Sequence, residues 1–505
     1  MSFRQSEQLQ RGSSLLVAIV LLLILTVAVF AAMPMLLGEQ RISGNDLRAK
    51  LAHHIAEAGL GHGREFLRLN ATTLLPTPLA TTNAALWTSC GTDSSFPCGA
   101  VEAAQRAETY RYRAGADGRT VDFPNGKLYD GTGLDAGNFD GQYDVGILLC
   151  RVTATSTCTR IASNAPGTVV FTIVSRGQVN GEQTTATVTE TVGTYKLVNA
   201  PPNVPPLMAA GAIAGIGSST IVANDNSGGF GVPLSMWTKN DFDGSGGSWQ
   251  TCRLDEYLRS SLTDVKMVGA DHDIPICLNC DCVAGKQTSS STASVGEGID
   301  ILDSSDTDSG KAKPGSPYYF PCDIFRYIFS VQSRSDNNTD GFCETLIGTS
   351  PNSNVELWLG VNAKPGTCST LNQNSRGLIW IKESCAPGGG GSLGGIIGSP
   401  DNPVALVIDG NVKFDTSAEI YGIVYLRYGG ADATGCVSGG TGCPEFLTGG
   451  GTAKIFGAVI IEGGGSINAN IDLVYVPKIL MNLTMAPENF RFGALPGSWS
   501  DRVTY

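Results

Sequence analysis

The chain has 505 residues, including 64 Gly and 24 Pro, and only 16% of its residues are charged. It is too long for one ordinary domain and too rich in turn-forming residues to be mainly helical, so we expect two or three mostly β units. The net charge of -12 argues against a large nucleic-acid surface, which would need clustered Lys and Arg, and no specific nucleic-acid partner is expected.

The first predicted element is an apolar helix. From Ser13 to Leu37 the chain has no charged residue, and a helix of this length exceeds the roughly 30 Å hydrocarbon core of a bilayer. Residues 13–37 are therefore a predicted membrane span. A secretory signal would have a shorter apolar core followed by a cleavage site. Here the better cleavage point precedes the span, after the polar leader 1–12, which ends in Gly12.

These features resemble the N-terminus of type IV prepilins. The resemblance implies that a prepilin peptidase cuts between Gly12 and Ser13 and that the new amine of Ser13 is methylated. The helix would first anchor the subunit in the membrane and then pack in the core of a fibre. Pro34 is the twenty-second residue after Gly12, where many pilins carry a proline, and a proline inside a helix removes a backbone hydrogen bond and kinks it.

The segment from Gln40 to Gly63 resembles more specifically the PilX-type minor pilins. The matching positions, without a gap, are Arg41, Gly44, Asn45, Leu51, Ala52, Ala56, Glu57, Ala58, Leu60 and Gly63. His53 and His54 depart from the family pattern. An ordinary amphipathic helix would explain the apolar stripe of this segment. It would not explain a Gly-Asn pair followed twelve residues later by Glu57 between two alanines.

One departure concerns the fibre core. Most pilins place a glutamate five residues after the cleavage glycine, where its carboxylate pairs with the N-terminal amine of a neighbouring subunit. This chain has Val17 at that position. PilX-type proteins and the largest minor pseudopilin of type II secretion often lack the glutamate too.

The rest of the chain predicts an α+β protein, in which the helix 13–68 precedes mostly β, disulfide-stapled domains. Residues 69–200 are expected to form a pilin-like β domain, in which Gly167–Val198 is a hairpin turning at Asn180-Gly181. A proline-rich linker, 201–207, should stand extended. A large β-rich domain is expected to cover 208–505.

An internal repeat lies in this last domain. Ala418–Gly430 aligns without gaps to Ala453–Gly465, thirty-five residues later. Short β-branched strands that return around glycines favour either a solenoid-like stack or a β-sandwich with two similar hairpins. The sequence leaves both architectures open.

Fourteen cysteines, several in close pairs, predict disulfides outside the cytoplasm. The favoured local bridges are Cys90–Cys98, Cys150–Cys158 and Cys436–Cys443. The alternative is a zinc site in which Cys277, Cys280 and Cys282 combine with His272.

Calcium is the strongest ligand signal in the sequence, although no cofactor is certain. Asp336, Asn338 and Asp340 supply oxygens at alternate positions before a glycine, and Glu344 could add a carboxylate. Clusters of Asp, Asn and Gly are also ordinary turns, which is the competing interpretation. No catalytic motif appears, so an enzyme is not expected, although two carboxylates meeting in a β-helical hydrolase would leave no sequence signature.

The resemblance to PilX-type pilins implies a minor pilin that acts in pilus assembly, initiation and tip presentation, with roles in adhesion or motility. Its expected partners are other minor pilins, the major pilin, a tip adhesin and the prepilin peptidase. It would lie in the bacterial inner membrane before assembly and then at the pilus or cell surface. The alternatives are a membrane-anchored adhesive or ligand-binding protein that does not polymerise, and a minor pseudopilin of type II secretion.

Overall fold

The architecture comes from a computed structural model. It describes residues 10–70, 74, 87–112, 126–127, 141–152, 158–159, 168–179, 182–199, 204–211, 213–225, 232–239, 242–244, 247–303, 320–335, 345–347, 353–386, 390–427, 446–448, 453–463, 465–468 and 470–504. These residues fall into two compact units. One unit comprises Met1–Thr194 and Phe492–Tyr505, and the other is Tyr195–Arg491.

The second unit is therefore inserted into the sequence of the first. The sequence predicts one domain over 208–505, whereas the last residues of the chain belong to the first unit. Their place follows from strand pairing, because β31 (Ser500–Thr504) pairs antiparallel with β7 (Thr185–Lys196).

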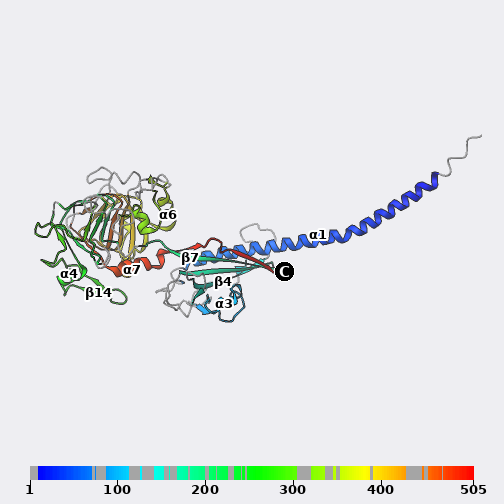
Figure 1. Ribbon diagram of the computed structural model, residues 1–505, viewed down its shortest axis with the longest axis horizontal. Coiled ribbons are helices and arrows are strands. Elements are labelled where there is room, and N and C mark those ends of the chain that lie inside the picture. Colours follow the sequence, from blue (N-terminus) through cyan, green and yellow to red (C-terminus); the bar gives the residue numbers. More distant parts are fainter. Residues whose placement is uncertain are drawn as a thin grey trace, which may run out of the picture. The chain divides into compact units, whose positions relative to one another are not determined.

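The first unit combines helix α1 (Gln10–Leu69) with an antiparallel sheet (Figure 1). The strand order of this sheet is β1-β2-β4-β6-β7-β30. The remaining bounds are β1 (Trp87–Ser89), η1 (Cys98–Ala100), α3 (Ala103–Arg106), β2 (Tyr110–Tyr112), β3 (Gly126–Lys127), β4 (Gly141–Val152), β5 (Cys158–Thr159), β6 (Thr168–Val179) and β30 (Phe490–Ala494). β6 and β7 pair antiparallel from Val170↔Gly193 to Gln178↔Thr185, which confirms the predicted hairpin. Its turn, Asn180-Gly181, lies outside the described residues.

The second unit is a parallel β-solenoid whose strands stack on three faces. The first face holds β22 (Ile396–Ile397), the first part of β25 (Glu419–Arg427), the first part of β27 (Ala453–Ile461), β29 (Ile471–Val474), β10 (Thr220–Val222), β13 (Gln250–Cys252) and β16 (Ser289–Ser290). The second face holds β20 (Lys364–Pro365), β21 (Gly377–Ile381), β23 (Val404–Asp409), the second parts of β25 and β27, β8 (Leu207–Ala209), β11 (Met236–Thr238) and β17 (Ile301–Leu302). The third face holds β24 (Val412–Phe414), β26 (Phe446–Thr448), β28 (Gly465–Asn468), β9 (Ile213–Ile216) and β12 (Phe242–Asp243).

The repeat found in the sequence is the register of this stack. β25 and β27 pair in parallel with Glu419 opposite Lys454 and Gly422 opposite Gly457, the same thirty-five-residue offset. Only the β13–β16 pair within the three faces is antiparallel among the described strands. The solenoid-like architecture is thus confirmed, and the sandwich of hairpins is wrong.

Two glycines form a corner between the first and second faces. β25 pairs with β22 before Gly422 and with β23 from Gly422 onward. Gly422 and Gly457 have φ of 134° and 153°, a backbone region that only glycine adopts readily. A Cβ at Gly422 would overlap the carbonyl oxygen of Val404, and one at Gly457 would overlap that of Gly422. The coils therefore turn at these glycines without a side chain inside the corner.

The chain enters and leaves the solenoid in the middle of the stack. β8, the first strand, and β29, the last, both pair with β27. From β8 the chain winds towards β13 and β17, returns at β20, and winds back through β23, β25 and β27. Entry and exit on one coil suit a domain whose two ends both continue into the same host unit.

Alternating side chains of the three faces fill the solenoid interior, including Leu406, Val424, Val459 and Ile213. The helices α5 (Ile324–Phe329), α6 (Asn354–Asn362) and α7 (Pro477–Met485) pack outside the second face. Part of the first face is covered by α4 (Leu254–Arg259) and by the hairpin of β14 (Lys266–Val268) and β15 (Ile274–Ile276). The remaining short elements are β18 (Arg334–Ser335), β19 (Thr345–Leu346), η3 (Cys368–Thr370) and η5 (Pro487–Asn489).

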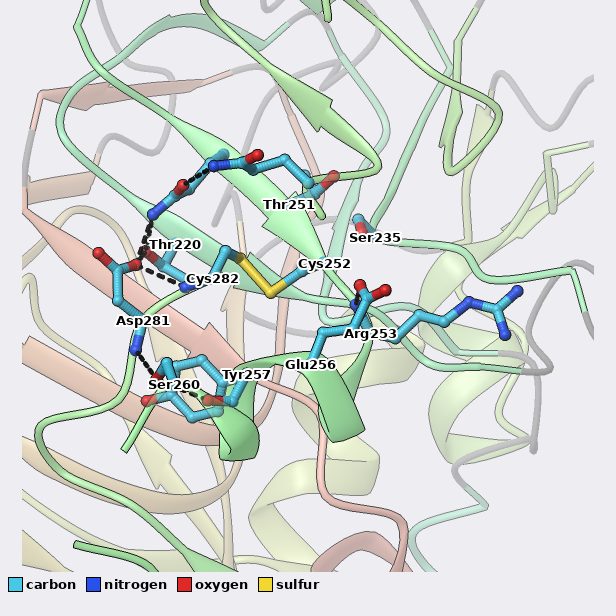
Figure 2. Close-up of a disulfide and its surroundings, with 12 residues drawn as sticks. Thr220, Ser235, Thr251, Cys252, Arg253, Glu256, Tyr257, Ser260, Asp281 and Cys282 are labelled. Carbon is cyan, nitrogen blue, oxygen red and sulfur yellow. Dashed lines mark hydrogen bonds between the residues drawn. A yellow bond between two sulfur atoms is a disulfide. The ribbon is translucent and has the colours of Figure 1, made fainter. Parts of the chain in front are cut away.

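Disulfides hold the segments around both ends of the stack. Cys252–Cys282 ties β13 to the loop after β15, and Cys368–Cys385 lies by the β20 and β21 end. Next to Cys252–Cys282, Asp281 Oδ1 accepts hydrogen bonds from Thr220 Oγ1, Gln250 Nε2 and the amide of Cys282 (Figure 2). This carboxylate links two neighbouring coils to the disulfide-bonded loop.

The predicted pairing is confirmed at Cys90–Cys98. Cys150 is disulfide-bonded, but the side chain of Cys158 is not among those described, so this pairing stays a prediction. Cys436–Cys443 lies outside the described residues. The zinc alternative is excluded, because Cys277 pairs with Cys280 and Cys282 pairs with Cys252. No described cluster of three or more His, Cys, Asp or Glu residues could hold a metal ion.

Candidate functional site: the N-terminal helix

The first half of α1 is an exposed apolar surface. Ser14–Ala31 is long and apolar enough to cross a membrane, and none of it is buried within the protein. Leu22 and Phe30 expose 69% and 70% of their surface. Figure 1 shows this part of the helix (dark blue) extending beyond the sheet of its own unit. Such a surface needs an apolar environment, either lipid or other helices.

The positions named for processing and kinking lie on this helix. Gly12 and Ser13 fall within α1, which begins at Gln10, and Pro34 lies in its interior. Helical structure is assigned through Pro34, and Figure 1 draws one continuous, gently curved helix. The side chains of Ser13 and Pro34 are outside the described set. Cleavage after Gly12 and a local kink at Pro34 therefore stay predictions.

The second half of α1 packs on the sheet through small residues. Ala52 and Ala56 are fully buried, and a Cβ at Gly177 of β6 would overlap Ala52 O and Ala56 N. One and two turns further on, Cβ atoms at Gly59 and Gly63 would overlap side chains of Ser175 and Ile173. Helix and strand backbones can approach this closely only because neither side carries a larger residue.

The structure gives the motif positions different roles. Ala56 is part of the packed face, whereas Asn45, Glu57 and Ala58 are exposed and Gly44 is only partly covered. Glu57 Oε1 lies 3.5 Å from His53 Nε2, and its Oε2 lies 3.3 Å from His54 Nδ1. Packing within the chain thus explains the small residue at Ala56, but it does not explain the residue types at the exposed motif positions.

An ion pair that sequence reasoning did not find fastens the helix to β7. Arg64 Nε and a second guanidinium nitrogen donate to the two carboxylate oxygens of Glu190 at 2.5 and 2.7 Å. Glu190 is only 5% exposed. The hydrogen bonds to Glu190 raise the pKa of Arg64. The partners are 126 residues apart in sequence, so no local pattern could reveal the pair.

One turn along, Arg68 and Glu65 form an exposed ion pair within the helix. Arg68 Nε donates to Glu65 Oε2 at 2.8 Å, and hydrogen bonding to Arg68 lowers the pKa of Glu65. Pairs at this spacing stabilise helices only slightly. The Arg64–Glu190 pair instead joins the helix to the sheet, as does the 3.0 Å hydrogen bond between His62 Nδ1 and the Tyr143 hydroxyl.

The calcium hypothesis falls outside the described residues. Asp336, Asn338, Asp340 and Glu344 all lie between the described ranges 320–335 and 345–347. The hypothesis therefore stays a prediction, with the turn interpretation beside it.

The N-terminal helix contains the part of the chain that matches a known protein family. Residues 11–60 match the family model described as PilX N-terminal, which covers both the exposed apolar half and the start of the packed half. Over these residues the chain is type IV pilin-like. Pilins are structural proteins and not enzymes. The exposed apolar helix fits the membrane anchoring that is typical of pilins.

Other comparisons add little about this pilin-like protein. No curated protein matches it. Among solved structures, it is similar to the crystal structure of the competence-associated pilin ComZ from Thermus thermophilus. The two are 13% identical, the alignment covers 91% of this chain and 98% of the other, and the TM-score is 0.21. At this TM-score and sequence identity, the similarity supports no conclusion about function.

Proposed function

We propose that this pilin-like protein is a minor pilin of a bacterial type IV pilus, acting in assembly or initiation and in presentation at the tip. The observation that carries the proposal is the PilX N-terminal match over residues 11–60 on a helix whose first half is apolar and unburied. Other pilins would cover this surface in the fibre, as lipid covers it before assembly. The exposed motif residues Asn45 and Ala58 are free to face such neighbours.

The absence of the usual carboxylate supports a minor role. With Val17 in place of glutamate, the subunit offers no partner to the N-terminal amine of a neighbour in an apolar core. An unpaired buried charge is strongly disfavoured, so this chain is poorly suited to repeat along a shaft. Its partners would be other minor pilins, the major pilin and a tip adhesin.

The mature N-terminus tests the proposal. Cleavage after Gly12 removes Arg4, Glu7 and Arg11, a net +1, so the formal charge changes from -12 to -13. Intact-mass analysis of protein purified from the envelope should give a chain that begins at Ser13 with a methylated amine. Gly12→Val should leave the precursor uncut, because the resemblance to type IV prepilins implies a peptidase that cuts after a glycine.

Gly61→Ala is the matched control, since this glycine lies on the same helix with nothing within 4 Å of an added Cβ. It should be processed normally. A parent chain that begins at Met1, or just after Ala32, would refute the pilin role and favour a permanently anchored adhesive protein or a secreted one. A minor pseudopilin would also begin at Ser13, but its loss would abolish protein secretion and leave pili intact.

A further inference from the structure

A cleft of about 470 Å³ lies on the surface of the second unit, where β7 ends and the helices α5 and α6 meet. Its volume falls within the range of small-molecule sites. The lining residues are Tyr195, Lys196, Asn199, Phe329, Ser330 and, beside Val331, Trp358. Aromatic rings and a few polar groups thus share one concave surface.

Two aromatic side chains give the cleft flat apolar walls. Tyr195 is 46% exposed, and Trp358 is partly exposed. The Trp358 ring packs edge-on against Phe325 at 5.8 Å and lies 6.0 Å from Phe329, which holds it in place. α6 itself is fixed by a capping box in which Ser353 accepts from the Glu356 amide. A ligand with apolar C–H faces could stack here without reordering the wall.

Lys196 is the only charged side chain among the described residues that line the cleft. Its Nζ lies 3.5 Å from the sulfur of Met485 and 6.0 Å from the centre of the Phe490 ring. In the described part of the chain no carboxylate pairs with it. Burial lowers the pKa of Lys196. A half-buried ammonium whose neighbours are a thioether and an aromatic ring would gain from an anionic ligand.

Polar groups flank the cation. Asn199 and Ser330 are both exposed in the cleft wall. Ser330 ends α5 with a left-handed backbone, φ 59°, and its amide donates to Arg326 O at 2.8 Å. Glycine or asparagine is usual at such a helix end. Here a hydroxyl occupies the position, so the cleft wall carries a donor and acceptor next to the aromatic surface.

We propose that this cleft binds a saccharide that carries a carboxylate, with the sugar ring against Trp358 and Tyr195 and the carboxylate at Lys196. Sugar rings combine apolar C–H faces with hydroxyl groups, which matches aromatic walls flanked by Asn199 and Ser330. The charge selects an acidic sugar over a neutral one. The inference extends the proposed tip presentation by naming the ligand class, and it rests on that function for its biological setting only.

The test uses the full chain in detergent micelles and two trisaccharides with the same linkage, one of galacturonate and one of galactose. Each galacturonate unit carries a carboxylate where the galactose unit carries a hydroxymethyl group. Calorimetry and saturation-transfer NMR should show tighter binding of the galacturonate trisaccharide. Lys196→Gln should weaken galacturonate binding about tenfold or more and leave galactose binding unchanged, because only the charge-assisted contact is lost. Tyr195→Ala should weaken both.

Lys382→Gln is the matched control. Lys382 is also a lysine over an aromatic ring, 4.1 Å from the centre of Trp380, and it does not line the cleft. It should leave both affinities unchanged. If neither sugar binds saturably, or if Lys196→Gln has no effect on galacturonate, the inference is overturned. It is also overturned if an acidic peptide binds as tightly as the sugar. A chain that begins at Ser13 and enters pili, yet fails these tests, would leave the minor-pilin proposal intact.

Discussion

At Gly177 the absence of a side chain decides how closely α1 can lie on β6. The helix atoms that a Cβ would meet there are Ala52 O and Ala56 N, which belong to the backbone and cannot rotate away. Gly422 and Gly457 act in the same way inside the solenoid corner. Glycine therefore serves both units as a spacer between backbones, and the cost of adding one methyl group depends on what that group meets.

We predict that Gly177→Ala lowers the free energy of unfolding of the first unit by about 1–3 kcal/mol, because the helix must move away from the strand. Gly61→Ala, on helix α1 itself, should instead raise the free energy of unfolding by about 0.5–1 kcal/mol. Nothing lies within 4 Å of the added Cβ, and alanine favours the helix over glycine. Hydrogen exchange of Ala49–Leu67 in the full chain measures both. Equal protection in the two variants would contradict the close approach at Gly177.

Among the elements, the strands near both ends of the solenoid are held by disulfides. An open coil has no further strand to pair with, and exposed edges invite unwanted pairing. Near one end, Cys252–Cys282 closes a loop with a sequence separation of 30, and the neighbouring Cys277–Cys280 pair has a separation of only 3. The two bonds lie in one region and differ mainly in loop length.

We expect removal of Cys252–Cys282, by alanine at both positions, to destabilise the second unit by about 3–4 kcal/mol. Removal of Cys277–Cys280 in the same way should cost only about 1–2 kcal/mol, because a short loop confines the unfolded chain less. Urea unfolding of the full chain, followed by tryptophan fluorescence, gives both values. If the short-loop pair costs as much as the long-loop pair, loop closure does not explain the stabilisation.

For the whole molecule, the insertion of Tyr195–Arg491 into the first unit would limit how the proposed pilin subunit could pack in a fibre. A domain of this size attached to every subunit would be hard to accommodate in a tightly packed helical array. Val17 adds an electrostatic reason against repetition, as the amine of a stacked neighbour would lack its carboxylate. At the distal end both constraints relax, because no subunit lies beyond.

We therefore predict a low-copy subunit at or near the pilus tip. Quantitative mass spectrometry of sheared pili should find it far below the major subunit. Gold labelling of the second unit should mark the fibre ends, and pili from a strain that lacks the chain serve as the control. Label spread evenly along the shaft, at a stoichiometry near that of the major subunit, would show the tip assignment to be wrong.

The sequence by itself determined the features that depend on neighbours along the chain. The uncharged run from Ser13 to Leu37, the PilX-like pattern around Glu57 and the β6–β7 hairpin are local signals of periodicity and spacing. The bridge Cys90–Cys98 is local too. The thirty-five-residue repeat also revealed a stacking register, because parallel coils place equivalent residues side by side.

Only the tertiary structure decided what depends on distant partners. The repeat could not separate a solenoid from a sandwich, since that choice lies in the parallel pairing of β27 with β8, far away in sequence. The Arg64–Glu190 pair and the return of β31 to the first sheet are equally non-local. The pairing of Cys252 with Cys282, which excluded the zinc site, also joins separate segments of the chain. Contacts between distant segments arise from the packing of the whole chain, so no window of sequence encodes them alone.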